Sequence, residues 1–508
     1  MDVVVIGAGI GGLSCAIGLA ARGARVTLLE QNAHVGGKLN VWRKDGFTFD
    51  TGPHVLTMRW AIDEVFASAG HRLDDSVDMV PLPTICRYHF PSGETLDACA
   101  DPNDAARAIA RFAPGEEAGF RRFLAYARQV TDATTDPFLR QDFGASVRVV
   151  PSPAQWGQLG QFLRLKPWRT LRDVVQDCFQ DPRLRAVFEL YALYSGSHPA
   201  RSSGIFATVA DVQWRGGTYY VQGGLYTLAL ALHALAQDMG IHIRTQARVH
   251  EVIVKRGRAR GVVTGDGERL YAEAVVCNAD ALSAIQTLVP PDARRKWTPA
   301  RVQKIEPSTS AFLLLLGVQG SFPALAHHNS FLARDGNAEF AAIFDQHCPA
   351  DDPTIGVTCQ SVTDRSKAPP GCSNLFVMTN PPALDRHGGF DWQAEAPAYR
   401  AKVLDKLEQM GLTNLRERIL VEQMWTPLDL QARYSAHRGA IYGLSSNGWR
   451  QGFLRPPNAS PDVRGLYFVG GSTHPGGGLP LCALSGTNVA REIAGQIAGE
   501  TGGGQEKS

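Results

Sequence analysis

Residues 3–30 constrain the fold of this chain more than any other stretch. Residues 3–6 are apolar and mostly β-branched, as in a buried strand, and residues 25–29 form a second, mostly apolar run. Residues 13–22 between them are rich in alanine and leucine and are followed by a glycine, which predicts a helix with a glycine stop. The stretch therefore predicts a strand, a helix and a second strand, which is the β-α-β unit of nucleotide-binding folds.

Glycines at the first turn, in the pattern G-x-G-x-x-G, indicate the ligand of this unit. Gly7 permits the tight turn, Gly9 lets a pyrophosphate approach the backbone, and Gly12 lets the helix pack closely on the strand. The free N–H groups of the helix N-terminus, where Gly11 lies, then face the phosphates. Glu30 ends the second strand and is placed to accept hydrogen bonds from both ribose hydroxyls. We expect a dinucleotide here rather than a purely structural turn, but the motif does not separate FAD from NAD.

The size and charge of the chain exclude some classes of protein. At 508 residues the chain is longer than one hydrophobic core usually supports, so at least two domains are expected. Hydrophobic residues make up 44% and charged residues 20%, which is typical of a globular protein. A net charge of +2 gives no reason to expect nucleic acid as a partner.

The cysteines and the apolar runs bear on metal content and location. The nine cysteines are scattered and form no C-x-x-C pair, so neither a zinc site nor a dithiol redox centre is expected. The first strand begins at residue 3 without a basic segment or cleavage site before it, and no apolar run has the length of a membrane span. These features predict a cytoplasmic protein and leave peripheral membrane contact open.

Further along the chain, hydrophobic spacing and turn residues predict the remaining elements. Residues 41–43 and 47–49 are expected to form a hairpin around Lys44, Asp45 and Gly46. Helices are expected over residues 63–70, 101–112, 116–130, 184–194, 225–239 and 481–497. Strands are expected over residues 218–222, 241–244, 249–254, 259–264, 272–276, 306–318 and 466–469.

The N-terminal motifs together resemble those of one flavoprotein superfamily. The first glycine motif, Glu30, the second glycine turn at Gly36, Gly37 and Lys38, and Gly52 before Pro53 resemble the fingerprint of the FAD-dependent amine oxidases and phytoene desaturases. The resemblance implies FAD as the cofactor. It places Glu30 on the adenosine ribose and residues 36–38 beside the pyrophosphate and ribityl chain.

A returning segment and the C-terminal segment extend the resemblance. Val249 matches a valine that contacts the adenine through its backbone in that superfamily, although simple strand packing explains it equally well. Residues 465–480 resemble the G-x-T-H-P-G-x-G-x-P signature of carotenoid desaturases, which lies against the ribityl chain and the isoalloxazine ring. The resemblance adds four cofactor-binding candidates: Gly470, Gly471, Gly477 and Leu479.

The resemblance covers nearly the whole chain and implies an α/β fold like that of the amine oxidases and phytoene desaturases. A Rossmann-like FAD-binding domain would be assembled from residues 1–75, 225–290 and 455–500. An inserted α+β substrate domain would come from residues 76–224 and 291–454. Residues 501–508 would form a disordered polar tail.

The run over residues 52–60, with residues 73–75, is similar to the 1-hydroxycarotenoid 3,4-desaturases. It implies desaturation at the end of an acyclic 1-hydroxy or 1-methoxy carotenoid, with oxygen or a quinone as electron acceptor. A phytoene or neurosporene desaturase acting in mid-chain and a flavin-dependent carotenoid isomerase remain alternatives. A prenyl-lipid carrier of the same fold is disfavoured because the flavin fingerprint is intact.

Two residues are candidates for a catalytic role. His474 lies in the loop expected near the flavin ring and could transfer a proton, or it could hydrogen-bond the turn. Arg59 could bind the flavin or the oxygenated substrate end, or it could form a salt bridge.

Residues 151–170 interleave aromatic and aliphatic side chains with cations, among them Trp156, Phe162, Arg164, Lys166 and Trp168. This composition suits a membrane surface, where aromatic rings lie at the headgroup level. The alternative is an amphipathic helix packed on the core. We expect a protein peripherally associated with the cytoplasmic side of the inner or an intracytoplasmic membrane.

Overall fold

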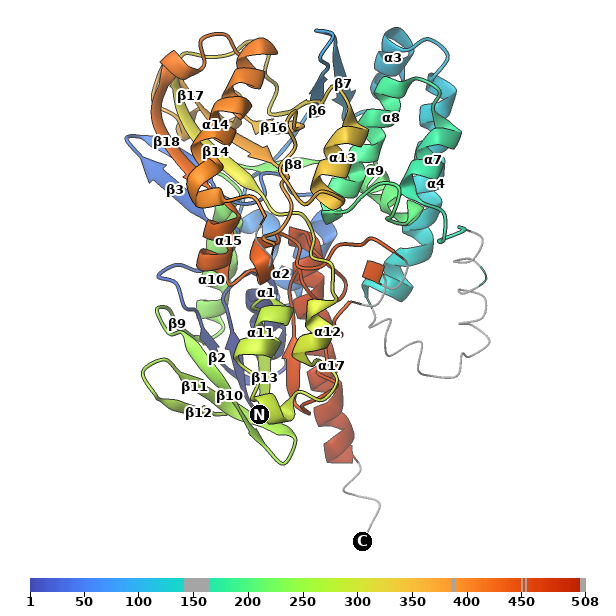
Figure 1. Cartoon of the computed structure of the whole chain (residues 1–508). Coiled ribbons are helices and arrows are strands. Elements are labelled where there is room, and N and C mark those ends of the chain that lie inside the picture. Colours follow the sequence, from blue (N-terminus) through green and yellow to red (C-terminus); the bar gives the residue numbers. More distant parts are fainter. Residues whose placement is uncertain (141–159, 161–164, 386–388, 449–450, 453–454, 503–508) are drawn as a thin grey trace.

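A computed structural model describes residues 1–140, 160, 165–385, 389–448, 451–452 and 455–502 (Figure 1). Two β-sheets divide the molecule. A five-stranded sheet lies in the lower half of Figure 1 and a seven-stranded sheet in the upper half, with a group of helices beside the upper sheet.

The five-stranded sheet is parallel throughout, in the order β19-β13-β1-β2-β9. Its strands are β1 (Asp2–Ile6), β2 (Arg25–Leu29), β9 (His242–Arg244), β13 (Ala274–Cys277) and β19 (Leu466–Phe468). Val4 of the central strand pairs with Thr27 on one side and Val275 on the other. Because both faces are covered, the sheet is buried, as parallel sheets usually are.

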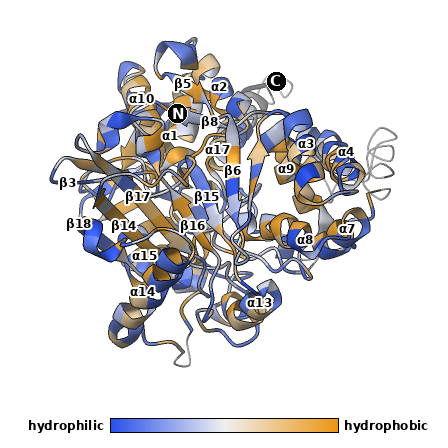
Figure 2. Ribbon diagram, turned by 90° about the horizontal axis from the view of Figure 1, so that it is seen from above, coloured by the Kyte–Doolittle hydropathy of each residue, from blue (hydrophilic) through white to orange (hydrophobic). Residues whose placement is uncertain are grey.

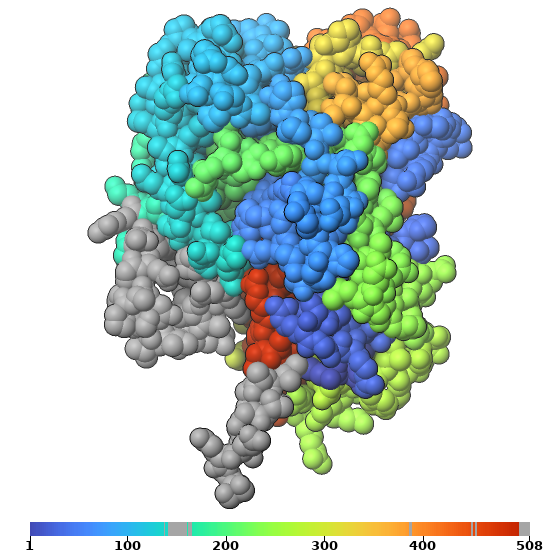
Figure 3. Space-filling view, turned by 180° about the vertical axis from the view of Figure 1, so that it is seen from behind, coloured from blue at the N-terminus to red at the C-terminus, as the bar shows by residue number. Residues whose placement is uncertain are grey.

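Helices cover one face of this sheet through a single apolar cluster. They are α1 (Ile10–Ala20), α2 (Arg59–Ser68), α10 (Tyr226–Asp238) and α17 (Leu479–Gly502). The view from behind shows α17, in red, lying against the blue N-terminal segment (Figure 3). A three-stranded antiparallel sheet and α11 (Ala281–Thr287) contribute to the cluster on the other face. The small sheet consists of β10 (Val249–Lys255), β11 (Arg258–Thr264) and β12 (Arg269–Tyr271).

The seven-stranded sheet has the order β18-β14-β17-β16-β15-β6-β7 and is antiparallel except between β15 and β6. Its strands are β6 (Thr84–His89), β7 (Thr95–Cys99), β14 (Phe312–Gln319), β15 (His328–Phe331), β16 (Ile355–Thr358), β17 (Cys372–Thr379) and β18 (Ile419–Trp425). Alternate residues of β14 face two different clusters. Leu314 packs with α14 (Trp392–Gln409), whereas Leu315 packs with the hairpin of β3 (Val41–Lys44) and β4 (Phe47–Asp50). This alternation is the two-residue period of a strand.

A helical unit packs against β6 and β7 through a third large cluster and stands to one side of the large sheet (Figure 2). It consists of α3 (Pro102–Phe112), α4 (Glu117–Thr134), α7 (Leu171–Cys178), α8 (Pro182–Glu189) and α9 (Thr208–Trp214). The other elements include the pair β5 (Met79–Pro81) and β8 (Tyr219–Val221), α12 (Pro299–Gln303), α13 (Gly336–Phe344) and α15 (Pro427–Tyr434). A π-helical turn (Thr135–Leu139) follows α4, and there are several short 3₁₀ turns.

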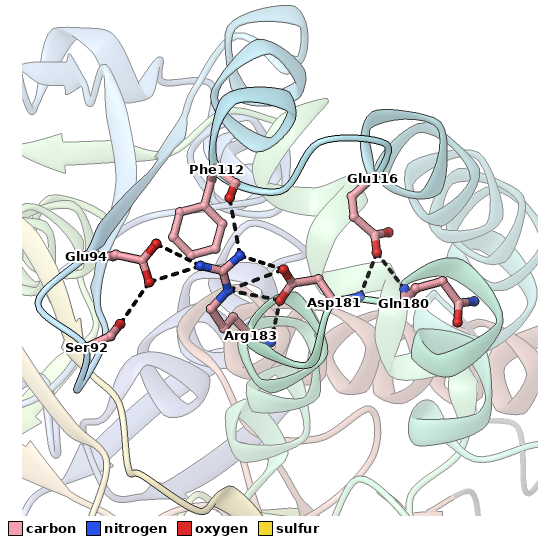
Figure 4. A network of polar contacts seen from close by, with 7 residues as sticks. All are labelled: Ser92, Glu94, Phe112, Glu116, Gln180, Asp181 and Arg183. Carbon is pink, nitrogen blue, oxygen red and sulfur yellow. Dashed lines mark hydrogen bonds and ion pairs between the residues drawn. The ribbon is translucent and has the colours of Figure 1, made fainter.

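A polar network joins this helical unit to the turn between β6 and β7 (Figure 4). Arg183 binds Glu94 at 2.8 Å and Asp181 at 2.7 Å, and its guanidinium lies 4.2 Å from the ring of Phe112. Glu116 accepts hydrogen bonds from the backbone N–H groups of Gln180 and Asp181 at 2.7 and 2.6 Å.

Most predicted elements are present with small changes of boundary. The helix expected over residues 184–194 consists instead of α8, which ends at Glu189, and a 3₁₀ turn over Leu190–Ser195. In the predicted hairpin, Asp45 and Gly46 both have positive φ angles, 49° and 81°, as a two-residue type I′ turn requires. The strand expected from residue 306 begins at Phe312, because residues 306–311 bond to other loops. The C-terminal helix continues to Gly502, two residues into the predicted tail, and residues 503–508 lie outside the described part.

Most of the predicted membrane-facing segment also lies outside the described residues, which include only residue 160 and residues 165–170 of it. Within the described part of the chain, no helix has both the length and the apolar character needed to cross a bilayer.

Candidate active site

A cavity of about 1080 Å³ lies between the two sheets and the helical unit. Three of its lining residues directly follow strands of the parallel sheet: Gly7 after β1, Glu30 after β2 and Asn278 after β13. A fourth, Gly470, lies two residues after β19. In open parallel sheets the carboxyl edge is where ligands bind. The volume lies just above the range of about 300–1,000 Å³ that is usual for a single ligand.

The structure brings nearly all predicted cofactor residues to this one cavity. They come from chain segments far apart in the sequence. Those that line it are Gly7, Gly9, Gly11, Glu30, Gly36, Gly37, Lys38, Gly52, Val249, Gly470, Gly471, Gly477 and Leu479. Gly12 is not among the lining residues. A Cβ at Gly12 would lie 2.0 Å from the carbonyl oxygen of Gly7, so this glycine allows the close packing of helix on strand.

The two predicted glycine turns lie against each other at the start of α1. The N–H of Gly36 donates to the carbonyl of Ala8 at 2.8 Å, and a Cβ at Gly37 would lie 3.2 Å from the Cα of Gly9. The N-cap of α1 is Gly9, so no side chain caps the first N–H groups of this helix. Unpaired N–H groups and the positive end of the helix dipole favour a phosphate there.

Glu30 is held rigidly at the edge of this glycine-lined region. Its side chain is 4% exposed and accepts hydrogen bonds from the N–H of Ala8 at 2.8 Å and the N–H of Asn32 at 2.9 Å. A carboxylate offers about four acceptor positions. Glu30 therefore retains acceptor capacity for a sugar hydroxyl, and the donors and acceptors of this end fit an adenosine diphosphate group.

Asn278 is a further residue of this region that the sequence analysis did not assign. Its side chain fills the space that the glycines leave, because a Cβ at Gly9, Gly11 or Gly470 would lie 2.6–2.7 Å from its amide atoms. Its Nδ2 donates to the carbonyl of Gly7 at 3.4 Å. The available signal was its place directly after a predicted buried strand.

The basic residues that line the cavity include Lys38 and Arg455. The Nζ of Lys38 donates to the carbonyl of Ile441 at 2.6 Å; burial lowers the pKa of this amine, and Asp280 partly opposes the shift. Arg455 was not predicted. It donates to Ser446 Oγ at 3.1 Å and to the carbonyl of Leu444 at 3.3 Å, and burial lowers its pKa to about 10. Arg455 therefore remains charged at neutral pH and attracts an anionic ligand.

The two predicted catalytic candidates lie outside the cavity lining. His474 is buried, and its Nε2 lies 2.7 Å from the carbonyl oxygen of Phe138. Arg59 is paired with Asp63 at 3.1 Å and with Asp74 at 2.5 Å. The geometry favours the structural alternative for each of them.

His54 is a histidine that does line the cavity. Its Nε2 lies 3.1 Å from the carbonyl oxygen of Asp50, and its ring centroid lies 4.0 Å from that of Phe376. Burial lowers its pKa to about 4, so the ring is neutral at pH 7. Because Nε2 must donate to a carbonyl, Nδ1 carries a lone pair and can accept a proton or a hydrogen bond.

Away from the glycines, the cavity continues as an apolar arm. Its walls are formed by the turn after α4, the 3₁₀ turn η4 (Gly204–Ala207), α9 and the face of the seven-stranded sheet, and α4 itself adds Thr131 and Thr134. The arm is lined by Phe138, Leu139, Ile205, Phe206, Val209, Val212, Leu313, Phe376 and Met378. A long apolar ligand could lie here with one end at the glycine-lined region.

Comparisons with known proteins agree with this geometry. Residues 10–494 match the family model described as flavin containing amine oxidoreductase. The chain is 36% identical to a 4,4'-diapolycopene oxygenase of Methylomonas sp over 97% of this chain and 98% of that protein. It is 33% identical to a 4,4'-diaponeurosporene oxygenase of Staphylococcus aureus over 97% of both chains.

Solved structures share the fold at low sequence identity. An oxidoreductase from Methanosarcina mazei matches with a TM-score of 0.64 and 17% identity over 97% of this chain and all of that chain. A cyclohexylamine oxidase from Brevibacterium oxydans matches with a TM-score of 0.59 and 16% identity over 98% and 99% of the two chains.

These matches confirm the predicted fold class and FAD as the predicted cofactor. The glycine cradle, the uncapped start of α1 and Glu30 fit that cofactor. The chain belongs to the family of flavin-containing amine oxidoreductases.

Proposed function

We propose that this protein is a flavin-dependent enzyme of carotenoid biosynthesis that oxidises one end of an acyclic carotenoid. The observation that carries the proposal is the apolar arm, which opens into the glycine-lined region within one cavity. Two relatives that match over 97–98% of their length are named as a 4,4'-diapolycopene oxygenase and a 4,4'-diaponeurosporene oxygenase, which supports a carotenoid substrate for this chain.

The reaction that we favour converts a terminal methyl group to an aldehyde. One methyl group and one dioxygen give one aldehyde and one water, so two hydrogens leave the carbon, one oxygen atom enters it, and no other reductant is consumed. Bound FAD supplies the electron-transfer chemistry of such a reaction. The chain supplies position and exclusion of water, because the substrate carbon must be held close to the cofactor's reactive atom.

Residues of the cavity have separate roles in this proposal. Leu313, Phe376 and Met378 form an apolar wall that orients the polyene and keeps water out. The neutral ring of His54, fixed by the Asp50 carbonyl, offers Nδ1 as a proton acceptor. No acidic partner is required for this role, because removal of hydrogen beside a conjugated chain needs little acid–base assistance.

The second candidate is the 3,4-desaturation of a 1-hydroxy or 1-methoxy carotenoid. Met58 and Trp60, from the run that resembles those desaturases, both line the cavity. Here two hydrogens leave adjacent carbons, and oxygen or a quinone accepts them. Arg59, between these two residues, faces other partners.

We further propose that the protein collects its substrate from a membrane on the cytoplasmic side, as a peripheral protein. A carotenoid resides in lipid, and Trp168 is 64% exposed at the end of the interleaved aromatic and basic segment. Co-sedimentation with liposomes, and its loss in Trp168→Ser, would support this; recovery of all protein in the supernatant would contradict it.

The function is tested by product analysis. FAD-loaded protein in aerobic liposomes is incubated separately with an acyclic hydrocarbon carotenoid, its 1-hydroxy derivative and phytoene. A product with one more oxygen and two fewer hydrogens than the hydrocarbon supports terminal oxygenation. Loss of two hydrogens from the hydroxylated substrate alone supports 3,4-desaturation. Conversion of phytoene indicates mid-chain desaturation, and an unchanged mass with a changed absorption band indicates isomerisation; either would overturn the proposal.

A further inference from the structure

A phenol hydroxyl lies in the mainly apolar arm of the cavity. The hydroxyls of Thr131, Thr134 and Thr135, which also line the cavity, donate to backbone carbonyls of their own helix. Tyr194 belongs to the short 3₁₀ turn η3 (Leu190–Ser195), lines the cavity and is 48% exposed. Gln213, a neighbour of the lining residue Val212 on α9, lines the same region. A hydrocarbon ligand cannot form a hydrogen bond with either polar group, so these groups suggest a ligand that carries a polar atom.

The hydroxyl of Tyr194 ends a chain of hydrogen bonds that begins in the core. Tyr191 is 2% exposed and packs among aromatic rings of the helical unit, with the rings of Phe123 and Phe188 about 6 Å away. Its hydroxyl donates to Oε1 of Gln213 at 3.1 Å. The Nε2 of Gln213 donates to the hydroxyl oxygen of Tyr194 at 3.2 Å.

The direction of this chain is fixed by the burial of Tyr191. If the amide of Gln213 were turned over, the proton of the Tyr191 hydroxyl would face an NH₂ group and lose its acceptor inside an apolar core, which is costly. The amide therefore keeps its NH₂ toward Tyr194, whose oxygen accepts. The proton of Tyr194 is then directed elsewhere, and no acceptor for it is found among the described residues.

Tyr194 remains a donor at all relevant pH values. Burial raises the pKa of its phenol, and the nearby Cys86 thiol and Tyr442 phenol add to the rise. Tyr194 also lines the cavity, so its phenol is within reach of a ligand there.

The same turn of chain lies against the glycine-lined region. The carbonyl of Gly196, two residues after Tyr194, accepts from the N–H of Thr309, whose own carbonyl accepts from the N–H of Ile441. The next residue, Tyr442, packs on Gly477, where a Cβ would lie 2.6 Å from its ring. Tyr194 is thus placed where the arm meets the cofactor side of the cavity.

We infer that Tyr194 donates a hydrogen bond to the oxygen of a carotenoid end that has already been oxidised once, a terminal alcohol or aldehyde. This inference rests on the proposed function and makes Tyr194 a residue that determines specificity. An oxygenated end pairs with the phenol, whereas a hydrocarbon end leaves its proton without an acceptor. The enzyme then retains a partly oxidised chain in preference to a fresh hydrocarbon.

The test compares two polyenes of equal length in anaerobic titrations of the FAD-loaded protein, one a hydrocarbon and the other carrying a terminal aldehyde. We expect the wild type to bind the aldehyde about three- to tenfold more tightly, as one neutral hydrogen bond allows. Tyr194→Phe should remove this preference: the aldehyde should bind more weakly, and the Kd of the hydrocarbon should stay the same or fall, because no donor is then left unpaired beside it. In the wild type, but not in Tyr194→Phe, the carbonyl stretch of the bound aldehyde should move to lower frequency.

Two further variants test whether the preference depends on the orientation of the Gln213 amide or on the loss of any phenol nearby. Tyr191→Phe, which releases the amide of Gln213 without touching the cavity, should weaken the preference. Tyr126→Phe removes a phenol that donates to the carbonyl of Leu165 and does not line the cavity, so the preference should remain. An intact preference in Tyr194→Phe, or an equal loss for both polyenes, would overturn the inference and leave the proposed function standing. Failure of the wild type to bind either polyene would overturn the proposed function itself.

Discussion

Glu30 is surrounded by backbone donors, with the N–H of Ala8 on one carboxylate oxygen and the N–H of Asn32 on the other. Glu30→Gln turns one of these acceptors into an NH₂ group, so a donor faces a donor and a sugar hydroxyl loses a charged partner. We expect the Kd for FAD to rise about tenfold or more, as loss of a charge-assisted hydrogen bond implies. Fluorescence titration of the apoprotein measures it.

The matched control is Glu251→Gln, which makes the same change of charge at an exposed residue of β10 that does not line the cavity. Its FAD affinity should equal that of the wild type. Equal affinities in both variants and the wild type would remove Glu30 from the proposed cofactor contacts.

Replacing glycine by alanine should have opposite effects on the free energy of unfolding at two helical positions. Gly12→Ala would place a Cβ 2.0 Å from the Gly7 carbonyl oxygen, a backbone atom that cannot turn aside, so we expect a loss of about 1–3 kcal/mol in the free energy of unfolding. Gly495 in α17 has no atom within 4 Å of such a Cβ, and alanine there should add up to about 1 kcal/mol. Chemical denaturation compares them; destabilisation by both would refute the packing argument.

At the scale of elements, Glu116 fastens the start of α8 to the start of α4. The carboxylate is 8% exposed and accepts from the N–H groups of Gln180 and Asp181 (Figure 4). Glu116→Ala removes two charge-assisted hydrogen bonds to partly buried backbone donors, so the free energy of unfolding should fall by about 1–3 kcal/mol.

The neighbouring residue provides the control for this prediction. Glu117 is 44% exposed and pairs with Arg121 on the surface of the same helix. Such pairs contribute little, so Glu117→Ala should change the free energy of unfolding by less than about 1 kcal/mol. Comparable losses for the two variants in urea titrations would contradict a specific role for the Glu116 contacts.

The elements themselves follow from local signals in the sequence. The hairpin at Lys44 to Phe47 needs two residues with positive φ, and Asp45 and Gly46 tolerate them. Strand β7 (Thr95–Cys99) was not predicted, because its short alternation lies among polar residues and it is stabilised by pairing with β6. Boundaries differ where loops from elsewhere take up the backbone hydrogen bonds, as before β14.

At the scale of the whole molecule, buried histidines make stability depend on pH. Burial lowers the pKa of His54 to about 4, and the pKa values of His198, His327 and His328 are lowered as well. These rings stay neutral in the folded chain, whereas the unfolded chain takes up protons below about pH 6.5. The contribution of these histidines to the free energy of unfolding is therefore fully present above pH 6.5, and it is lost as the pH decreases toward 4.

For His54 alone, the lowered pKa in the folded chain reduces the free energy of unfolding by about 2 kcal/mol when the pH falls from 7 to 5. His54→Gln should reduce the loss of stability over that interval by about this amount, measured by denaturant titration at both pH values. His71→Gln, at an exposed histidine, should not alter the loss of stability between pH 7 and pH 5. A pH dependence of His54→Gln equal to that of the wild type would show that His54 does not carry it.

The site was less predictable than the elements, because it depends on which distant residues meet. Motifs with their own backbone geometry, such as those around Gly9 and Gly477, predicted from sequence many residues that line the glycine-rich end of the cavity. Asn278, Arg455 and Tyr194 have no such motif, and their roles arise from the packing of three separate chain segments. The same limit applies to His474: its loop was located, but the side chain turns to the carbonyl of Phe138.

The assembly of one cofactor region from three parts of the chain leads to a last prediction. Because Gly9, Gly36, Asn278 and Gly470 lie together across the sheet, FAD should stabilise all of their segments at once. Hydrogen exchange of apoprotein and FAD-loaded protein should show slower exchange over residues 7–13, 36–39, 278–282 and 470–482. The network of Arg183 and Glu116 lies outside the cavity lining, so exchange over residues 180–184 should change little. Protection confined to residues 7–39 would mean that the first segment binds the cofactor alone, and that the returning segments contribute only packing.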